Sequence, residues 1–231
     1  MFPYALDFNQ PINSWDVSNV TDMSYMFRDA RKFNETLKDW NVSNVTDMSG
    51  MFLSAAIFNQ PINSWDVSNV TDMSGMFHSA ARFNQPLNDW DVSKVTLMKE
   101  MFRNARSLHT YADMANWDVS NVTDMSGMFR DATIFNAPIN DWDVSNVTTM
   151  EDMFWGAARF NQPLNDWDVS KVTHMRRMFS YSGFNGVIEN WDVSNVTDMS
   201  SMFYNARAFN QSLNDWNVSN VTDMSSMFRD A

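Results

Sequence analysis

Apolar and polar residues follow one order that recurs every 24 to 27 residues along the chain. The stretch FNQPINSWDVSNVTDMSGMFHSAAR, residues 58–82, is representative. A fixed period in this range is typical of a solenoid, in which each unit contacts mainly its neighbours. We therefore expect a single repeat solenoid over residues 1–231, with no separate capping domain. Its register is set by Trp15, Trp40, Trp65, Trp90, Trp117, Trp142, Trp167, Trp191 and Trp216.

The first half of each repeat predicts a short strand, as residues 61–70 illustrate. Ile62, Trp65 and Val67 follow the pattern apolar-x-x-apolar-x-apolar, which turns Trp65 and Val67 to one side. Asp66 then points to the other side, because strand side chains alternate. We expect these strands to stack in parallel as an inner sheet.

The second half of each repeat has the spacing of a short helix. Val70, Met73, Met76, Phe77 and Ala80 fall within about 120° when each residue advances 100° around a helix axis, the width of a core-facing stripe. The predicted fold class is therefore an α/β repeat solenoid. It is a leucine-rich-repeat-like horseshoe with a parallel inner sheet, short helices outside and about nine coils of 25 residues.

The motif WDVSNVTDMSGMF, together with FNQPI, resembles the tryptophan-rich, BspA-like branch of the leucine-rich repeats found in bacterial surface proteins. The resemblance covers essentially the whole chain. It implies a non-enzymatic repeat protein that is secreted or anchored at the cell surface. It carries over no catalytic residues, because the family motif is a packing motif.

Methionine and phenylalanine occupy fixed columns of the repeat. Eighteen of the 20 methionines fall in two columns, one from Met23 to Met224 and one from Met26 to Met227. The 18 phenylalanines are equally regular. Stacked core ladders explain this order better than a metal or redox role, since methionine fills irregular gaps and packs well on aromatic rings.

Composition narrows the function classes. The net charge of −12 disfavours nucleic acid and anionic membranes as partners. Absence of cysteine removes thiolate metal sites and cysteine nucleophiles. No apolar run approaches the roughly 18 residues of a membrane span, so we expect no direct membrane insertion. His78, His109 and His174 share no repeat column, so we expect solvated surface histidines and no catalytic or cofactor-binding residues.

Aspartates flank the tryptophan column on the polar side of the predicted strands. Twelve carboxylates would face one way, about 4.8 Å apart between neighbouring strands. One interpretation is an acidic concave face that binds cations or a basic ligand, with Ca²⁺ as the candidate cofactor at Asp91, Asp118, Asp143 and Asp168. The other is that the aspartates accept hydrogen bonds from elbow backbone and serines. The columns contain Asp16, Asp66, Asp91, Asp118, Asp143, Asp168 and Asp192 after the tryptophan, and Asp39, Asp89, Asp141, Asp166 and Asp215 before it.

These patterns predict an exposed scaffold for adhesion or for binding a protein or cell-surface ligand, and not an enzyme. Trp155, which lies outside the tryptophan column, is a further candidate contact, although it could equally cover the adjacent coil. The alternative is a structural subunit that stacks end to end into filaments by head-to-tail self-association. The candidate end contacts are Phe2, Phe8, Trp216, Met227 and Phe228.

Overall fold

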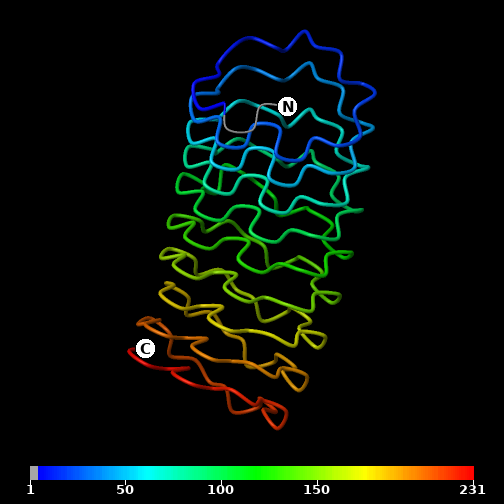
Figure 1. The fold of residues 1–231 in the computed structure, drawn as a ribbon. Helices are drawn as coiled ribbons and strands as arrows, with labels where there is room; N and C mark the ends of the chain where they lie inside the picture. Colours follow the sequence, from blue (N-terminus) through cyan, green and yellow to red (C-terminus); the bar gives the residue numbers. More distant parts are fainter. Residues whose placement is uncertain (1–4) are drawn as a thin grey trace.

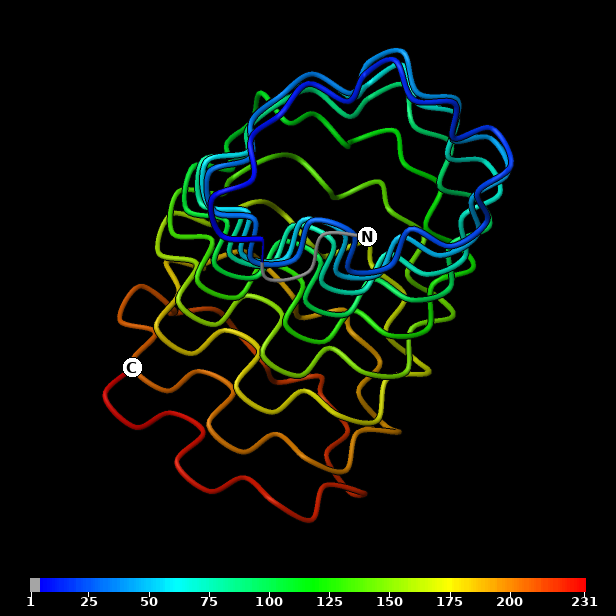
Figure 2. The ribbon, with the colours of Figure 1, turned by 45° about the horizontal axis from the view of Figure 1, so that its top comes forward.

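The computed structural model describes residues 5–231, which form a stack of coils (Figure 1). Each coil is one turn of the chain and lies on the coil before it. The tilted view shows the coils as flattened loops that surround a shared interior (Figure 2). The first and last coils therefore lie at opposite ends of the stack, far apart in space.

The described residues contain no α-helix and no sheet. Strand-type pairing among these residues is limited to isolated parallel bridges, each made by one residue of a coil: Asp22–Asp47, Asp47–Asp72, Asp72–Leu97, Leu97–Asp124, Asp124–Thr149, Thr149–His174, His174–Asp198 and Asp198–Asp223. The predicted α/β solenoid, with a parallel inner sheet and outer helices, is therefore wrong. The fold is a repeating stack of turns rich in tryptophan and phenylalanine. Within the same residues no helix is long and apolar enough to cross a membrane.

Backbone hydrogen bonds explain why residues 70–80 are not helical. Every second N–H group in this segment bonds to the next coil, as when Met73 N donates to Leu97 O at 3.0 Å. The residues between close short turns, as when Met76 N donates to Met73 O at 3.1 Å. A helix needs successive N–H groups to bond four residues back within the segment. Here half of them are committed to a neighbouring coil.

Two positions in each of these segments have a left-handed backbone, which also excludes a helix. The first is glycine in three coils, at Gly50, Gly75 and Gly127. The second is mostly aspartate, serine or asparagine, residues that are favoured in turns and include those most tolerant of positive φ. Its members are Asp29, Ser54, Ser79, Asn104, Asp131, Gly156, Tyr181, Asn205 and Asp230.

The predicted strand is reduced to three residues between two turns. Trp65 N donates to Ile62 O at 3.1 Å, and Val70 N donates to Val67 O at 2.9 Å. Trp65 and Val67 do share one buried side, as the alternation predicts, with exposed fractions of 2% and 1%. The extended piece is too short to form a backbone ladder with its neighbours.

Side chains join the coils where the ladder is missing. Trp65 Nε1 donates to Leu37 O of the preceding coil at 3.0 Å, and Asn69 Nδ2 donates to Ser43 O at 2.8 Å. The same indole bond is made by Trp40, Trp90, Trp117, Trp142, Trp167, Trp191 and Trp216. Each tryptophan therefore both fills the core and satisfies a buried carbonyl.

An asparagine ladder joins the return loops in the same way. Asn59 N donates to Asn34 Oδ1 at 2.8 Å, and Asn84 N donates to Asn59 Oδ1 at 2.9 Å. His109 N continues the ladder by donating to Asn84 Oδ1 at 2.9 Å. The asparagine of FNQP is thus a link between coils.

The core consists of stacked side-chain columns, which confirms the predicted ladders. Phenylalanine rings of successive coils stack with centroids 5.5 Å apart for Phe27–Phe52 and 5.7 Å for Phe52–Phe77. The tryptophans stack similarly, at 6.5 Å for Trp40–Trp65. Methionines of both columns are buried beside them in the middle coils. A ring such as Phe52 is thus covered by stacked rings on both faces.

Truncating one tryptophan tests this double role. Trp65→Ala should lower the free energy of unfolding by about 3–5 kcal/mol, because it removes a large buried ring. Trp65→Phe keeps a stacked ring but leaves Leu37 O without its indole donor, which should cost about 1–3 kcal/mol. Urea denaturation followed by far-ultraviolet circular dichroism measures both. A Trp65→Phe variant as stable as the wild type would contradict the indole contribution.

Glycine substitution distinguishes turns from a helix. Ser201 has a φ of 57°, so Ser201→Gly should raise the free energy of unfolding by about 1 kcal/mol through relief of left-handed strain. Ser74, whose φ is not positive, lies one position earlier in its own coil, so Ser74→Gly should lower it by about 0.5–1 kcal/mol. A helix predicts a loss in both cases. Equal losses in thermal unfolding would therefore contradict the turn geometry.

Candidate functional site

The predicted aspartates after the tryptophans lie at the surface of the stack. All seven are exposed, and Oδ1 of each accepts the N–H of the serine two residues later. In Asp16 the acceptor also receives Ser18 Oγ at 2.6 Å. The hydrogen bonds from Ser18 and Ser93 lower the pKa of Asp16 and Asp91 below the usual value. These hydrogen bonds favour the ionised form of the two carboxylates. We call the set of seven aspartates the acidic face.

The interpretation of these aspartates as hydrogen-bond acceptors at the elbows is thus confirmed for Oδ1. No concave sheet carries these residues, so that part of the prediction is wrong. Among residues 5–231, no group of three or more His, Cys, Asp or Glu side chains is placed to hold a metal ion. Calcium binding at Asp91, Asp118, Asp143 and Asp168 stays a prediction without support from the geometry.

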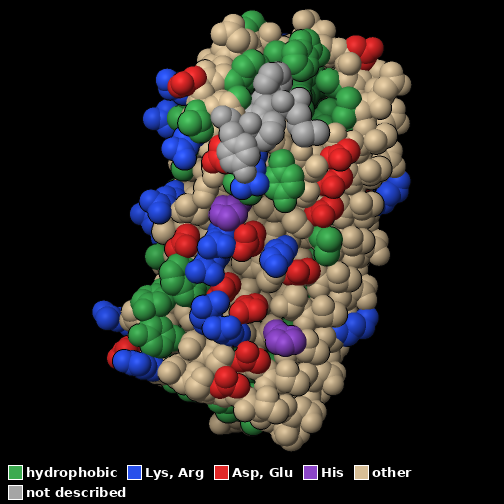
Figure 3. Space-filling view, in the orientation of Figure 1, with side chains coloured by type: hydrophobic (Ala, Val, Ile, Leu, Met, Phe, Trp, Pro, Cys, Tyr) green, Lys and Arg blue, Asp and Glu red, His purple; other side chains and the backbone are tan. Residues whose placement is uncertain are grey.

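A second polar surface lies on the segments predicted as helices, and we call it the turn ridge. Figure 3 shows acidic, basic and histidine side chains gathered over the middle coils of this surface. Stacking brings equivalent positions of neighbouring coils side by side, so charged residues there meet in pairs. The turn ridge comprises residues 22–30, 47–55, 72–80, 97–105, 124–132, 149–157, 174–182, 198–206 and 223–231.

Asp152 is the centre of the largest ion-pair network on the turn ridge. It is only 7% exposed and lies between arginines of the coils before and after it. Arg130 Nη1 is 2.7 Å from Oδ2, and Arg177 approaches with Nε 2.7 Å from Oδ1 and Nη2 2.8 Å from Oδ2. The two arginines compensate the charge of the buried carboxylate and tie three coils together.

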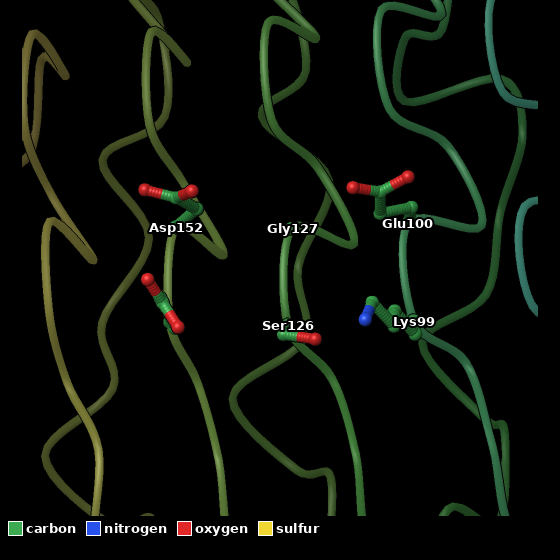
Figure 4. A pocket seen from close by; sticks show the side chains of 6 residues that line it. Lys99, Glu100, Ser126, Gly127 and Asp152 are labelled. Carbon is green, nitrogen blue, oxygen red and sulfur yellow. The ribbon is translucent and has the colours of Figure 1, made fainter.

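A hollow opens beside this network because Gly127 has no side chain. Figure 4 shows the carboxylates of Glu100 and Asp152 on either side of Gly127, with Lys99 nearby. Glu100 is itself paired with Arg103 at 2.6 Å. The carboxylates at this hollow are therefore already compensated, and the hollow follows from the missing side chain.

His78 is the one histidine with a distinct environment. Its ring is partly buried on the turn ridge, with Nδ1 3.3 Å from Glu100 Oε2. Burial lowers the pKa of His78 below 6.5, and the nearby Arg103 and Arg130 act in the same direction against the opposing effect of Glu100. His78 is therefore more easily kept neutral than a solvated histidine.

Trp155 lies on the turn ridge and contacts both adjacent coils. The Arg130 guanidinium lies 4.6 Å from its ring, and Tyr181 meets it edge to face at 5.5 Å. Tyr181 in turn packs against Tyr204 at 5.3 Å. Trp155 thus begins an aromatic row that covers adjacent coils, and its role as a binding contact stays a prediction.

Sequence reasoning did not single out Asp152, Arg177 or Tyr181. Asp152 and Arg177 stand where the commoner repeat has glycine or serine, and Tyr181 stands where it has aspartate, serine or asparagine. Those departures were the available signal. The helical interpretation places these positions on the solvent-facing side of a helix, so it gave no reason to examine them.

The candidate end contacts lie in different environments. In the last coil Phe228 is 51% exposed, whereas Met227 is 7% exposed. Phe8 and Trp216 are half-buried against the core. Phe2 lies outside the described residues. Head-to-tail association through these positions stays a prediction.

A family model identifies the chain. It is described as "Mycoplasma protein of unknown function, DUF285" and matches residues 1–112, 108–186 and 180–231. The chain belongs to this family, and the three consecutive matches agree with its repeated construction. The finer assignment to BspA-like leucine-rich repeats is not confirmed. No curated protein matches the sequence.

The depressed pKa of His78 predicts a pH dependence of stability. Protonation is harder in the folded than in the unfolded chain, so the contribution is present above about pH 6.5 and is lost as the pH falls through the folded pKa. The melting temperature should therefore fall less between about pH 7 and pH 5 in His78→Gln than in the wild type. His174→Gln, which replaces an exposed histidine of the turn ridge, is the control. Equal pH profiles for wild type and His78→Gln would contradict this prediction.

Proposed function

We propose that this DUF285-family protein is a non-enzymatic binding scaffold, secreted or displayed at the cell surface, that holds a basic protein partner on its acidic face. The observation that carries the proposal is the regular array of exposed aspartates, one in nearly every coil. Each side chain is fixed by its own serine, so the array is ordered before a partner arrives. Preorganised charge favours fast and selective association with a surface of opposite sign.

The distribution of charge favours the acidic face over the turn ridge as the surface that binds a basic partner. On the turn ridge, arginines pair with Glu100, Glu151 and Asp152. By contrast, the acidic face makes no ion pair with Lys or Arg among the described residues. Its charge is therefore available to a partner. The net charge of −12 adds long-range attraction for a basic protein.

The interior supports a scaffold in preference to an enzyme. The buried residues of the described chain are almost all apolar, and the buried polar ones are Asp152, Ser180, Ser182 and Ser200. Asp152 is paired with two arginines, and Ser182 Oγ donates to Phe179 O at 2.8 Å. Asp152 thus joins neighbouring coils and Ser182 closes a turn within its own coil, so both have structural partners.

Binding to a synthetic basic peptide tests the acidic face. Fluorescence anisotropy with labelled deca-lysine at low ionic strength should show saturable binding to the 231-residue chain. The quadruple variant Asp91→Asn, Asp118→Asn, Asp143→Asn and Asp168→Asn should weaken it by about tenfold or more, because it removes four neighbouring charges. Asparagine keeps the Oδ1 acceptor, so the elbows should remain folded.

A matched variant separates the face from total charge. Asp47→Asn, Asp72→Asn, Asp124→Asn and Asp198→Asn remove the same charge from aspartates that also accept a serine N–H, but on the turn ridge. This variant should weaken binding by only about twofold. Equal weakening by both variants would mean that deca-lysine senses net charge alone, and it would overturn the proposed face.

A further inference from the structure

One coil of the stack is a residue shorter than its neighbours at the return turn. Other coils place two residues between the buried alanine and the core phenylalanine, as in Ala157 to Phe160. Here Ser182 is followed by Gly183 alone before Phe184. The phenylalanine column continues unbroken, with ring centroids 6.0 Å apart for Phe160–Phe184. The missing residue therefore shortens the surface turn and leaves the stacking of the phenylalanine core in place.

The shortened turn leaves an open notch of about 440 Å³ in the side of the stack. Phe184 N lies 3.4 Å from Ser182 Oγ, where other coils use the alanine carbonyl. Gly183 is required at the floor, because a Cβ there would lie 2.3 Å from Ala158 O. The notch is lined by Ala158, Tyr181, Ser182, Gly183, Asn205, Arg207 and Ala208.

Two side chains give the notch its chemistry. Tyr181 is 42% exposed and presents part of an aromatic ring, held between Trp155 at 5.5 Å and Tyr204 at 5.3 Å. Arg207 Nε donates to Asn205 Oδ1 at 2.8 Å, which orients the guanidinium. Within residues 5–231, no carboxylate lies within ion-pair distance of Arg207. Its terminal nitrogens are therefore available to an anion.

The surroundings favour an anion there despite the acidic chain. The return turns carry a row of basic residues, namely Arg31, Lys32, Arg82, Arg106, Arg159 and Arg207. Figure 3 shows basic side chains along the left edge, with a hydrophobic cluster beside them in the C-terminal half. The notch thus combines an aromatic surface with an oriented guanidinium.

We propose that this notch binds a carboxylated sugar residue, of the uronic acid type, within a surface glycan. The carboxylate pairs with the terminal nitrogens of Arg207, a geometry that suits a bidentate contact. The C–H face of the sugar ring lies against Tyr181, whose π face carries partial negative charge. This proposal rests on the binding role proposed above, and it adds a second surface with its own ligand class.

A sugar suits the notch better than an acidic peptide. The walls belong to the coils immediately before and after the shortened one, and the notch is open to solvent. A rigid pyranose loses little freedom when it binds, whereas an aspartate or glutamate side chain must be ordered together with its backbone. A ring that carries its own carboxylate meets Tyr181 and Arg207 together.

Glycine-selective NMR provides a direct test on the 231-residue chain. With ¹⁵N-glycine labelling the chain gives six amide signals. Gly183 lines the notch, while Gly50, Gly75 and Gly127 lie in coils that do not line it and supply the turn-ridge reference signals. Titration with glucuronate should shift the Gly183 signal and leave the turn-ridge signals unchanged. Glucose lacks the carboxylate and acetate lacks the ring, so each should bind about tenfold more weakly than glucuronate.

Two variants and one matched control make the result decisive. Arg207→Gln should weaken glucuronate binding about tenfold. Arg106→Gln should leave it unchanged, because Arg106 makes the same 2.8 Å bond to Asn104 beside a return turn of full length. Inserting one alanine after Gly183 restores the common repeat length and should abolish binding, with unchanged turn-ridge signals showing that the coils remain folded.

Several outcomes would overturn the proposal. Acetate or inorganic phosphate binding as tightly as glucuronate would reduce the notch to a simple anion site. Tighter binding of tetraglutamate would point to a protein ligand instead. Equal effects of Arg207→Gln and Arg106→Gln, or binding retained after the insertion, would place the ligand elsewhere. The deca-lysine experiment tests the acidic face, so its result neither supports nor contradicts the proposal for the notch.

Discussion

A coil of this protein cannot satisfy its own backbone, and that constraint governs the rest of the structure. With no helix and no sheet in the described chain, every second N–H of the turn segments needs an acceptor in the adjacent coil. On the opposite side, indole and asparagine side chains make the links that a backbone ladder would otherwise make. Burial of the rings and hydrogen bonding of the polar groups thus depend on the same neighbouring coil. Stability is therefore a property of pairs of adjacent coils.

The sequence allowed the period and the core to be predicted, but not the backbone between them. Trp65, Val67, Met73 and Phe77 are buried as the pattern indicates. The helical spacing was misleading because a row of short turns also brings residues three and four apart to one side. Gly75 and the turn residues near it carried the contrary signal, although glycine within a helical pattern is tolerated often enough to be discounted.

For the candidate sites, regular features were predictable and exceptional ones were not. The acidic face follows from the WDVS motif, since an aspartate beside a buried tryptophan must point outward. The pairing of Asp152 with Arg130 and Arg177 depends on which coils stand next to one another in the ridge. The notch depends on a single missing residue, whose effect is set by the coils above and below it. Such features appear only when the coils are stacked.

The Trp65–Leu37 bond also has a genetic consequence. Because its donor and acceptor recur in nearly identical form one coil later, removal of a whole repeat by recombination rejoins compatible partners. The same holds for duplication of a repeat. An allele that differs by one such unit inherits a complete set of bonds at the new junction, whereas a frameshift or a partial unit does not. The fold therefore tolerates a change of length by whole repeats, because each junction between coils uses the same contacts.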